Sequence, residues 1–449
     1  MAKLDGPVVL LISYHFYPSN EIGGRRTTAL ARCLASKGVR VIVVSAFGGA
    51  TIVPGSEVMA GVFAAPVEQP RKVLIDFMVS RKRRAAQTSP ENGVGRTIHH
   101  TRPTSVLWRM QSGIRRTFFQ IAYFVDEHKH WGWRAAREAV RVGKKYDARL
   151  VISSSPPFTA LLTGRWVASR LGIPHVADLR DPWTDAFVIG HPSRRFELRL
   201  LRSLEGWALR SAAAITSTTS TVCELLAARY PSMQRKLHVV RNGYEGDVPT
   251  ADTDTGRRLA ILFAGELYLG RNPFPFLATL ETLLARSDVD PARISVTFMG
   301  NVAHYNGQSL ASWLEGRRCA AVVKILPQSP QIEVIRAVAA STLLLNLSQE
   351  QRLSIPAKTF EHLACAREIL LLCENDSETA SLVAGVPGVN QVDQRDIHVL
   401  ENVLLDIYRR HVVQSRMTVP TKNDVTKFSR AVANERFWNV IASVADLHD

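Results

Sequence analysis

Short runs of hydrophobic residues alternate with amphipathic segments along most of the chain. Runs such as Val8–Ser13 and Leu259–Ala264 are typical of strands buried on both faces of a parallel sheet. Between the runs, apolar residues recur every three or four positions, as in helices that pack one face on a sheet. The alternation predicts an α/β protein with doubly wound, Rossmann-like sheets.

One polar stretch divides this alternation into two halves. Residues 245–257 are rich in Asp, Thr, Gly and Pro, a composition typical of a linker between domains. We therefore expect a first domain over residues 1–244 and a second over residues 258–420. The last helical pattern lies within residues 421–449, and we expect it to cross back and pack on the first domain. A chain of 449 residues agrees with more than one core.

Charge and cysteine usage restrict the partners and the compartment. Lys and Arg number 56 against 40 Asp and Glu, which gives a net charge of +16 and favours an anionic partner. The five cysteines lack the spacing of a zinc site or a disulfide framework, so we expect a reducing, cytoplasmic location and no metal. No apolar run approaches the roughly 20 residues needed to span a bilayer, and we expect a soluble chain without a signal peptide.

Residues 71–116 break the strand–helix rhythm. They contain eleven Lys or Arg against only Asp76 and Glu91, interleaved with aliphatic and aromatic residues. One interpretation is a solvated insertion, because runs of charge are usually solvated. The other is a basic amphipathic surface that contacts an anionic membrane or a lipid-diphosphate acceptor, with the protein at the inner face of the membrane.

The segment 354–373 carries candidate chemistry. Its pattern predicts a helix that follows one buried strand and leads into another, with Lys358 and Glu361 on a shared face near the helix start. A lysine there can meet a phosphate, and a carboxylate three residues later can accept both hydroxyls of a ribose. The alternative is an ordinary amphipathic helix with a weak surface ion pair between Lys358 and Glu361.

Two segments of the first half add candidates. Gly23 and Gly24 follow the first strand and allow a backbone to approach a phosphate or sugar closely, although a simple tight turn explains them equally well. A predicted strand at His175–Leu179 leads into the polar cluster of Asp178, Arg180 and Asp181, at the edge where open α/β sheets bind ligands. A structural Asp–Arg pair is the alternative there.

Six motifs in this order resemble those of the retaining glycosyltransferases of family 4, which have the two-domain GT-B fold. The motifs are YHFYPSNEIGG, SSSPPFTALLTG, IPHVADLRDPW, VVRNGYE, FAGELYLGRN and IPAKTFEHLACAREILLL. The resemblance covers about residues 8–373. It implies two Rossmann-like domains that face each other across a cleft, with a C-terminal helix that crosses back to the first domain.

The resemblance also implies a role for each candidate residue. Glu361 would hold the donor ribose, Lys358 and Thr359 would lie near the diphosphate, and Arg271 would stabilise the leaving phosphate. Asp178, Arg180 and Asp181 would contact the transferred sugar. The other donor-binding residues would be Gly23, Gly24, Gly265, Glu266, Asn272 and Gln328, the last in the loop expected to recognise the base.

The chain departs from the family pattern at three positions. Leu353 stands where the family often has a second glutamate, Glu266 where many members have an arginine, and Arg180 where many have a histidine. The usual pair of cations would then consist of Arg271 and Lys358.

The resemblance implies transfer of a hexose from a nucleotide-diphosphate sugar to a hydroxyl of a saccharide, lipid-linked or small-molecule acceptor. Transfer would retain the anomeric configuration, need no metal or cofactor, and serve bacterial polysaccharide, glycolipid or glycoconjugate synthesis. The alternatives are a sugar-nucleotide epimerase of the same fold and a non-catalytic nucleotide-sugar-binding subunit. We expect no nucleic-acid partner, because the charge is concentrated in one insertion and no nucleic-acid-binding motif occurs.

Overall fold

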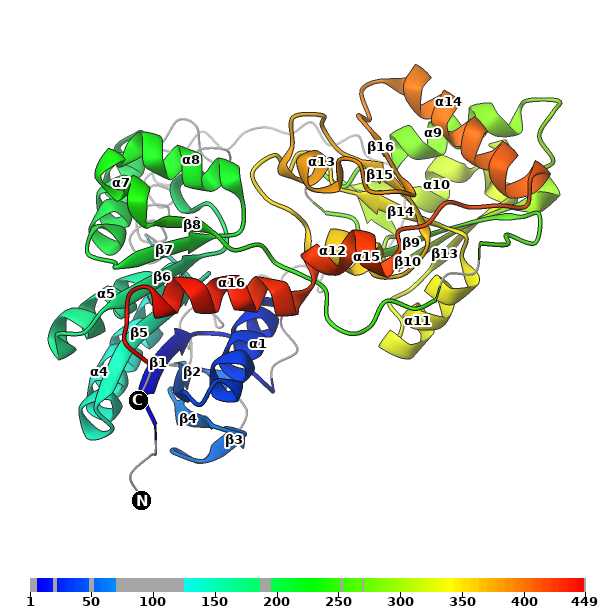
Figure 1. Cartoon of the computed structure of the whole chain (residues 1–449). Helices are drawn as coiled ribbons and strands as arrows, with labels where there is room; N and C mark the ends of the chain where they lie inside the picture. The colour runs from blue at the N-terminus through cyan, green and yellow to red at the C-terminus, as the bar shows by residue number, and fades with distance from the viewer. Residues whose placement is uncertain are drawn as a thin grey trace, which may run out of the picture. The chain divides into compact units, whose positions relative to one another are not determined.

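The computed structural model describes residues 6–18, 22–47, 52–69, 125–185, 195–250, 253–268 and 270–447. The chain forms two compact α/β units (Figure 1). The described parts of Met1–Leu179, Trp183–Ile215 and Ala442–Asp449 make up the first unit, and Arg180–Pro182 and Thr216–Ile441 make up the second. The basic segment 71–116 lies outside the described residues.

The first sheet is an eight-stranded, mostly parallel sheet. Its hydrogen-bonded order is β3-β4-β2-β1-β5-β6-β7-β8, and the short strand β3 is antiparallel to β4. The strands are β1 (Val8–Ser13), β2 (Arg40–Ser45), β3 (Glu57–Met59), β4 (Val62–Pro66), β5 (Ala148–Ser155), β6 (His175–Leu179), β7 (Ala214–Ser217) and β8 (Leu237–Val239). Every residue of the central strand β1 is buried, which agrees with its continuous hydrophobic sequence.

Helices connect these strands. They are α1 (Ile22–Ser36), α4 (Lys129–Lys145), α5 (Thr159–Leu171), α7 (Arg195–Arg210) and α8 (Ser220–Arg229). Trp131 of α4 is fully buried and packs with β1 and α5 in the core of the unit. Helix α5 ends at Gly172, whose φ of 70° is the left-handed conformation that favours glycine at the end of a helix.

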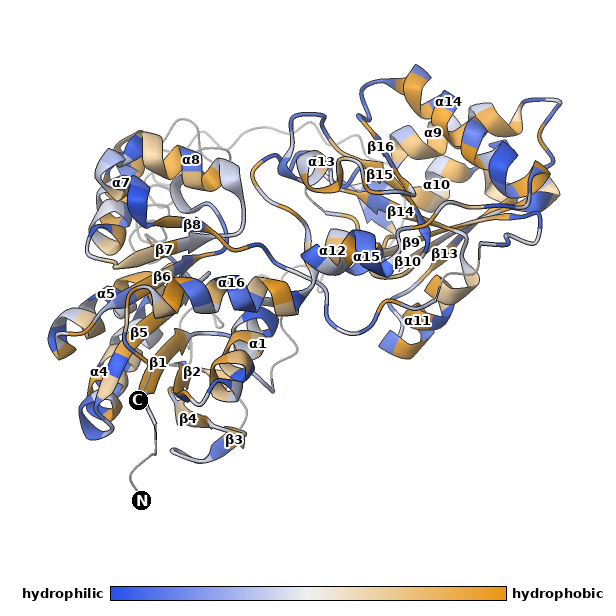
Figure 2. Cartoon of the chain, in the orientation of Figure 1, coloured by the Kyte–Doolittle hydropathy of each residue, from blue (hydrophilic) through white to orange (hydrophobic). Residues whose placement is uncertain are grey.

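The second sheet has six strands, in the order β13-β10-β9-β14-β15-β16, and its described pairings are all parallel. The strands are β9 (Leu259–Glu266), β10 (Ile294–Asn301), β13 (Val323–Leu326), β14 (Leu343–Leu347), β15 (Glu368–Leu372) and β16 (Val389–Val392). A two-stranded hairpin, β11 (His304–Tyr305) and β12 (Gln308–Ser309), lies apart from this sheet. Figure 2 shows hydrophobic residues along the strands of both sheets.

The helices that pack on this sheet are α9 (Phe274–Leu284), α10 (Leu310–Leu314), α11 (Gln331–Ala340), α12 (Ala357–Leu363), α13 (Glu378–Val383), α14 (Ile397–Tyr408) and α15 (Lys422–Val425). Helix α16 (Arg430–Ala442) follows them in the chain. The π-helical turn Arg409–Val413 extends α14. Within the described residues, no helix combines the length and the hydrophobicity that crossing a membrane requires.

Most predicted elements are present, with shifts at their ends. Gly23 and Gly24 lie inside the first turn of α1 and not in a loop before it. Strand β9 runs two residues further than predicted, through Gly265 and Glu266, because both pair with β10. The predicted fold class, α/β with two doubly wound sheets, is confirmed. The predicted limits of the domains stay a prediction: the first sheet ends at Val239, close to the predicted limit at 244, whereas the second compact unit begins at Thr216.

The segments that enter and leave the second sheet lie side by side. Asp254 and Arg416 form an antiparallel bridge, and Met417 N donates to the carbonyl oxygen of Thr253 at 3.1 Å. Ser415 Oγ donates to Asp254 Oδ1 at 2.8 Å. These bonds close the unit at the amino-terminal edge of its sheet.

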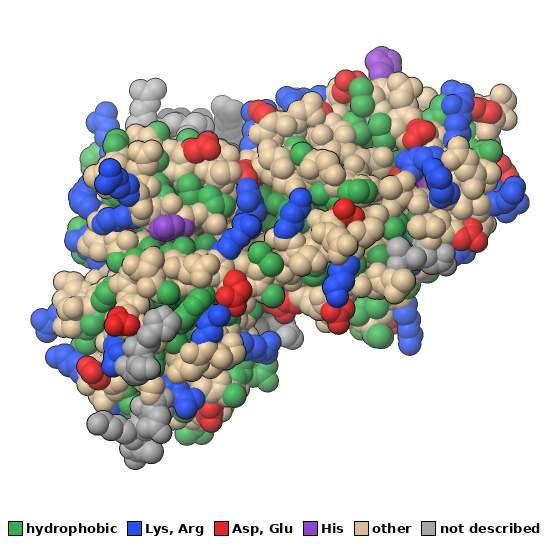
Figure 3. Space-filling model, viewed as in Figure 1, with side chains coloured by type: hydrophobic (Ala, Val, Ile, Leu, Met, Phe, Trp, Pro, Cys, Tyr) green, Lys and Arg blue, Asp and Glu red, His purple; other side chains and the backbone are tan. Residues whose placement is uncertain are grey.

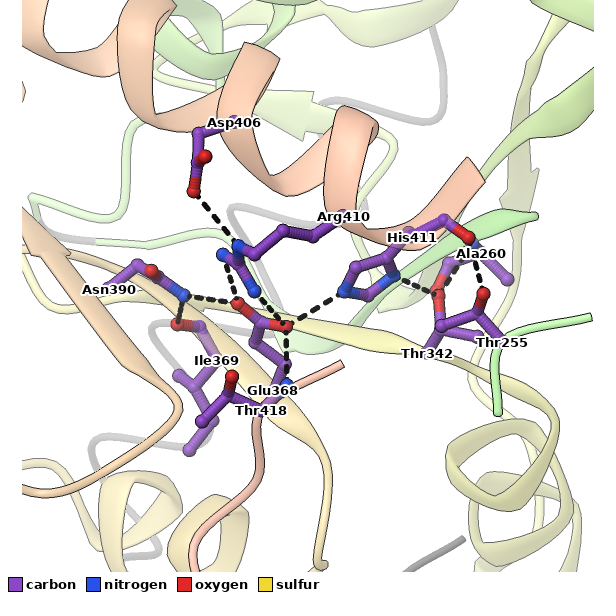
Figure 4. Close-up of polar contacts among 10 residues, drawn as sticks. All are labelled: Thr255, Ala260, Thr342, Glu368, Ile369, Asn390, Asp406, Arg410, His411 and Thr418. Atoms are coloured by element: carbon purple, nitrogen blue, oxygen red, sulfur yellow. Dashed lines mark hydrogen bonds and ion pairs between the residues drawn. The ribbon is translucent and has the colours of Figure 1, made fainter. Parts of the chain in front are cut away.

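A buried charge network reinforces this closure (Figure 4). Glu368, the first residue of β15, accepts two hydrogen bonds from Arg410, at 3.0 and 2.7 Å, and lies 2.8 Å from His411 Nε2. Asn390 Nδ2 and the backbone N of Thr418 also donate to the Glu368 carboxylate. Burial raises the pKa of Glu368, but the bonds from His411 and Arg410 outweigh burial, and the net pKa lies below the ordinary value.

We predict that Glu368→Gln lowers the free energy of unfolding by about 3–5 kcal/mol, because the buried Arg410 guanidinium then has no buried counter-charge. Denaturant unfolding at neutral pH measures this. Since the folded-state pKa of Glu368 is depressed, its contribution is present above the ordinary glutamate pKa of about 4.3 and is lost as the pH falls below it. The difference between wild type and variant should therefore shrink in acid.

Asp406→Asn is the matched control for this variant. Asp406 also pairs with Arg410, but its side chain is 68% exposed. Loss of such a surface pair should cost less than about 1 kcal/mol. An equal loss of stability in both variants would show that burial does not determine how much each ion pair with Arg410 contributes to stability.

Candidate functional site

The carboxyl end of β9 gathers several predicted site residues. Arg271 is 9% exposed, its Nη1 donates to the carbonyl oxygen of Glu266 at 3.4 Å, and its guanidinium lies 4.3 Å from the ring centroid of Tyr268. The Glu266 carboxylate accepts a hydrogen bond from Asn301 Nδ2 at 2.6 Å. The loop after β9 therefore holds one cation in a fixed, largely buried position.

Lys358 reaches the same end of β9 from the first turn of α12. Its ammonium donates a hydrogen bond to the carbonyl oxygen of Ala264, and it lies 5.9 Å from the ring centroid of Phe263. A Cβ atom on Gly265 would lie 2.0 Å from Lys358 Nζ. Gly265 is thus the residue that leaves room for the lysine side chain.

The charge of Lys358 is destabilised. Burial and then the nearby Arg271 guanidinium lower the pKa of Lys358 to about 8, although Glu361 and Glu266 act in the opposite direction. The four side chains are therefore close enough to interact electrostatically. A cation held with little hydration beside a second cation is suited to meet an anionic ligand.

The remaining candidates of the second unit lie in different environments. Glu361 and Gln328 are exposed, the latter in the loop between β13 and α11. Thr359 is buried and its hydroxyl accepts a hydrogen bond from Asn346 Nδ2 at 3.1 Å. Asn272 Oδ1 accepts from Phe274 N at 3.0 Å and positions the start of α9. Within the described residues no cluster of His, Cys, Asp and Glu is placed to hold a metal ion.

Asp178 of the first unit belongs to a buried ion pair. Both of its carboxylate oxygens accept from Arg26 of α1, at 3.1 and 2.9 Å, and Ser154 Oγ donates at 2.7 Å. Asp178 and Arg26 are 0% and 4% exposed. The structural alternative of an Asp–Arg pair is therefore present, but with Arg26 in place of Arg180.

The other candidates of this region are close to Arg26 or Asp178 in the sequence. Gly24 is buried, and a Cβ atom there would lie 3.3 Å from the backbone N of Phe16. Gly23 is half-buried in the same turn of α1. Arg180 is buried and its carbonyl oxygen accepts from Thr218 Oγ1 at 2.7 Å, whereas Asp181 is exposed.

Two residues were not predicted from the sequence. Arg26 lies four positions before Leu30, on the inward stripe of α1, and an arginine on such a stripe indicates a buried partner. His362 is buried beside Lys358, and burial followed by that positive charge lowers its pKa to about 3. His362 is therefore neutral at physiological pH, and only its position next to Glu361 could have indicated it.

The first half of the chain is similar to one known protein family. The model of the family described as "Glycosyl transferase 4-like domain" matches residues 23–243. These residues belong to the glycosyl transferase 4-like family. The resemblance to family 4 glycosyltransferases is thereby confirmed.

The chain is also similar to one curated relative and to several solved structures. The 2-deoxystreptamine glucosyltransferase of Streptomyces kanamyceticus is 28% identical in an alignment of 136 residues, and the match covers 28% of this chain and only 33% of that protein. Sucrose-phosphate synthase from Thermosynechococcus elongatus aligns with a TM-score of 0.60 at 10% identity, over 97% of this chain and 98% of its own. Anabaena HepE in complex with UDP-glucose aligns with a TM-score of 0.54 at 12% identity, over 97% and 99%. These solved structures share the two-domain GT-B fold with this chain, and the predicted fold class is thereby confirmed.

We predict that Asp178→Asn lowers the free energy of unfolding by about 3–5 kcal/mol, because Arg26 then remains buried without its counter-charge. Asp181→Asn changes an exposed carboxylate in the same segment and should cost less than about 1 kcal/mol. Denaturant unfolding of both variants checks the difference. Equal stability of Asp178→Asn and wild type would show that the ion pair contributes little to folding.

Proposed function

We propose that the protein transfers a sugar from a nucleotide-diphosphate donor to an acceptor hydroxyl. The observation that carries this proposal is the placement of Lys358 beside Arg271 at the carboxyl end of β9, in a chain whose first half is a glycosyl transferase 4-like domain. Two positive charges held this close are unfavourable until an anion lies between or against them. A diphosphate supplies that anion.

Fixed cations would also assist the chemical step. As the bond between the anomeric carbon and the diphosphate breaks, negative charge grows on the leaving phosphate and positive charge grows on the sugar. Arg271 and Lys358 are held by the Glu266 and Ala264 carbonyl oxygens, so they can stabilise the leaving group without reorganising. This role supports a metal-independent reaction. Glu361, exposed one helical turn after Lys358, is the proposed ribose ligand.

The finer assignments are part of the same proposal. We infer a hexose donor, because the curated relative is a glucosyltransferase and HepE was crystallised with UDP-glucose. We also propose retention of configuration, a saccharide, lipid-linked or small-molecule acceptor, and a place in polysaccharide, glycolipid or glycoconjugate synthesis. Asp178 would act on the sugar indirectly. Its ion pair with Arg26 would fix the position of the backbone and of the neighbouring residues that contact the sugar.

The first test combines donor binding with turnover. A thermal-shift screen with UDP-, GDP-, ADP- and dTDP-sugars should show one large stabilisation, since a ligand that binds only the folded state raises its stability. With that donor, Lys358→Ala and Glu361→Ala should each reduce turnover by about two orders of magnitude or more. Lys422→Ala, an exposed lysine of α15, is the matched control and should have wild-type turnover.

Three results would overturn the proposal. Near-native turnover in both variants would remove Lys358 and Glu361 from the site. Tight donor binding by the wild type without turnover on any acceptor would indicate a non-catalytic nucleotide-sugar-binding protein instead. Isomerisation of the donor sugar without an acceptor would identify an epimerase.

The pKa of Lys358 predicts a pH dependence. Because this pKa is lowered to about 8, Lys358 carries its charge below pH 8 and loses it as the pH rises further. The kcat/KM for the donor should therefore decline above about pH 8 in the wild type. In Lys358→Arg the guanidinium stays charged, so any remaining activity should lack this decline. An unchanged alkaline limb in Lys358→Arg would show that another group titrates.

A further inference from the structure

Three helices of the first unit lie side by side and present an unusual outer surface. Helix α5 packs against α4 on one side and against α7 on the other. Several large apolar side chains on these helices are exposed: Trp133 by 62%, Phe196 by 79%, Leu200 by 43% and Trp207 by 41%. Aromatic groups of this size are normally buried in a monomer, and their clustering indicates an interaction surface.

Cations interleave with these aromatic groups. Trp133 of α4 lies 6.0 Å from Trp166 of α5, measured between ring centroids. Arg165, the neighbour of Trp166, lies 4.0 Å from the ring centroid of Trp207 on α7, and it donates a hydrogen bond to the Trp207 carbonyl oxygen. One aromatic–arginine row therefore crosses all three helices.

The surface is strongly positive. The described side chains of the three helices include eleven Lys or Arg against three acids, and one of these acids, Glu205, is fully buried. The cations are Lys129, Arg134, Arg137, Arg141, Lys144, Lys145, Arg165, Arg170, Arg199, Arg202 and Arg210. Lys and Arg side chains project along the left edge of the first unit in Figure 3, where Figure 1 places α4, α5 and α7.

An apolar recess adjoins this surface. A cavity of about 400 Å³ lies beside α4 and is lined by Ile42, Phe63 and Val142, with Arg141 and Lys145 among its other lining residues. Both cations belong to α4, one of the three helices of the surface, and Arg141 is paired with Glu138, which also lines the recess. Apolar area next to cations is the combination that an anionic amphiphile requires.

We propose that the α4–α5–α7 surface binds an anionic lipid bilayer. Trp side chains favour the boundary between hydrocarbon and water, and Lys or Arg near the surface are attracted to anionic headgroups. The exposed Phe196 and Leu200 add apolar contacts, which would strengthen binding to a bilayer but not to a nucleic acid. Three adjacent helices on one face of a sheet also form a broad surface, which suits a planar partner.

Vesicle binding by the full chain tests this proposal. We expect sedimentation with vesicles of 70% phosphatidylcholine and 30% phosphatidylglycerol at low salt, and little with phosphatidylcholine alone. Arg134→Gln with Arg137→Gln, both exposed on α4, should weaken binding roughly tenfold or more, because each basic residue near the surface contributes about 1 kcal/mol. Trp133→Ser with Phe196→Ser should weaken binding without changing its dependence on salt.

Matched controls come from the second unit. Arg318→Gln with Lys324→Gln removes two exposed cations there, and Ile332→Ser with Ile335→Ser removes two side chains that are each 55% exposed. Both control variants should bind vesicles like the wild type. Because residues 71–116 are intact in every variant, any membrane contact that they make cannot produce the difference.

Several results would overturn the proposal. They are an absence of binding by the wild type, equal binding to both kinds of vesicle, or wild-type binding by the α4 and Trp133–Phe196 variants. If these variants instead lose affinity for duplex or single-stranded DNA, or lose self-association in light scattering, the surface belongs to a nucleic acid or to a second copy of the chain. Thermal melting of each variant verifies that the fold is intact.

Discussion

The constraint on which this molecule depends is that a buried charge requires a partner. Parallel sheets covered by helices leave little solvent inside either unit, so an ionised side chain there loses its hydration. Asp178 is paired with Arg26, and Glu368 is paired with Arg410. Lys358 differs, because its described hydrogen bond is to a neutral carbonyl oxygen, and burial together with the Arg271 guanidinium lowers its pKa. Two ion pairs thus stabilise the scaffold, whereas Lys358 is the charge that we propose for a ligand.

The arrangement separates these tasks along the strands of the second sheet. Glu368 begins β15 and lies at the amino-terminal edge, whereas Gly265 and Lys358 meet at the carboxyl end of β9. The amino-terminal edge is stabilised by a network whose groups are satisfied by one another. The carboxyl edge carries loops, exposed carboxylates and a lysine with a lowered pKa, which are features of binding sites. Stability and proposed function therefore draw on different residues of one sheet.

Much of the fold could be predicted from hydrophobic pattern. Strands β1 and β6 have the predicted bounds, and every residue of both strands is buried. The strands Glu57–Met59 and Val62–Pro66 were not predicted, since they are short and owe their conformation to pairing with each other and with β2. Gly265 and Glu266 were expected in a loop, but backbone pairing with β10 outweighs the low strand preference of glycine.

The candidate site was only partly accessible to sequence reasoning. Spacing could place Lys358 and Glu361 on one helix, and Arg271 in a loop, because those are local relationships. It could not show that Asp178 pairs with Arg26, which is 152 positions away, nor that Gly265 makes room for a lysine from another element. Such contacts arise only when the sheet brings distant segments together.

The bridge between Asp254 and Arg416 has a consequence for the modularity of the chain. The strand-and-helix unit that it closes begins and ends at one place, so its entry and exit are held together by its own hydrogen bonds. A unit with adjacent ends can be joined to, or separated from, another domain without rearranging its interior. The second unit could thus have been combined with different first domains while its own sheet stayed the same.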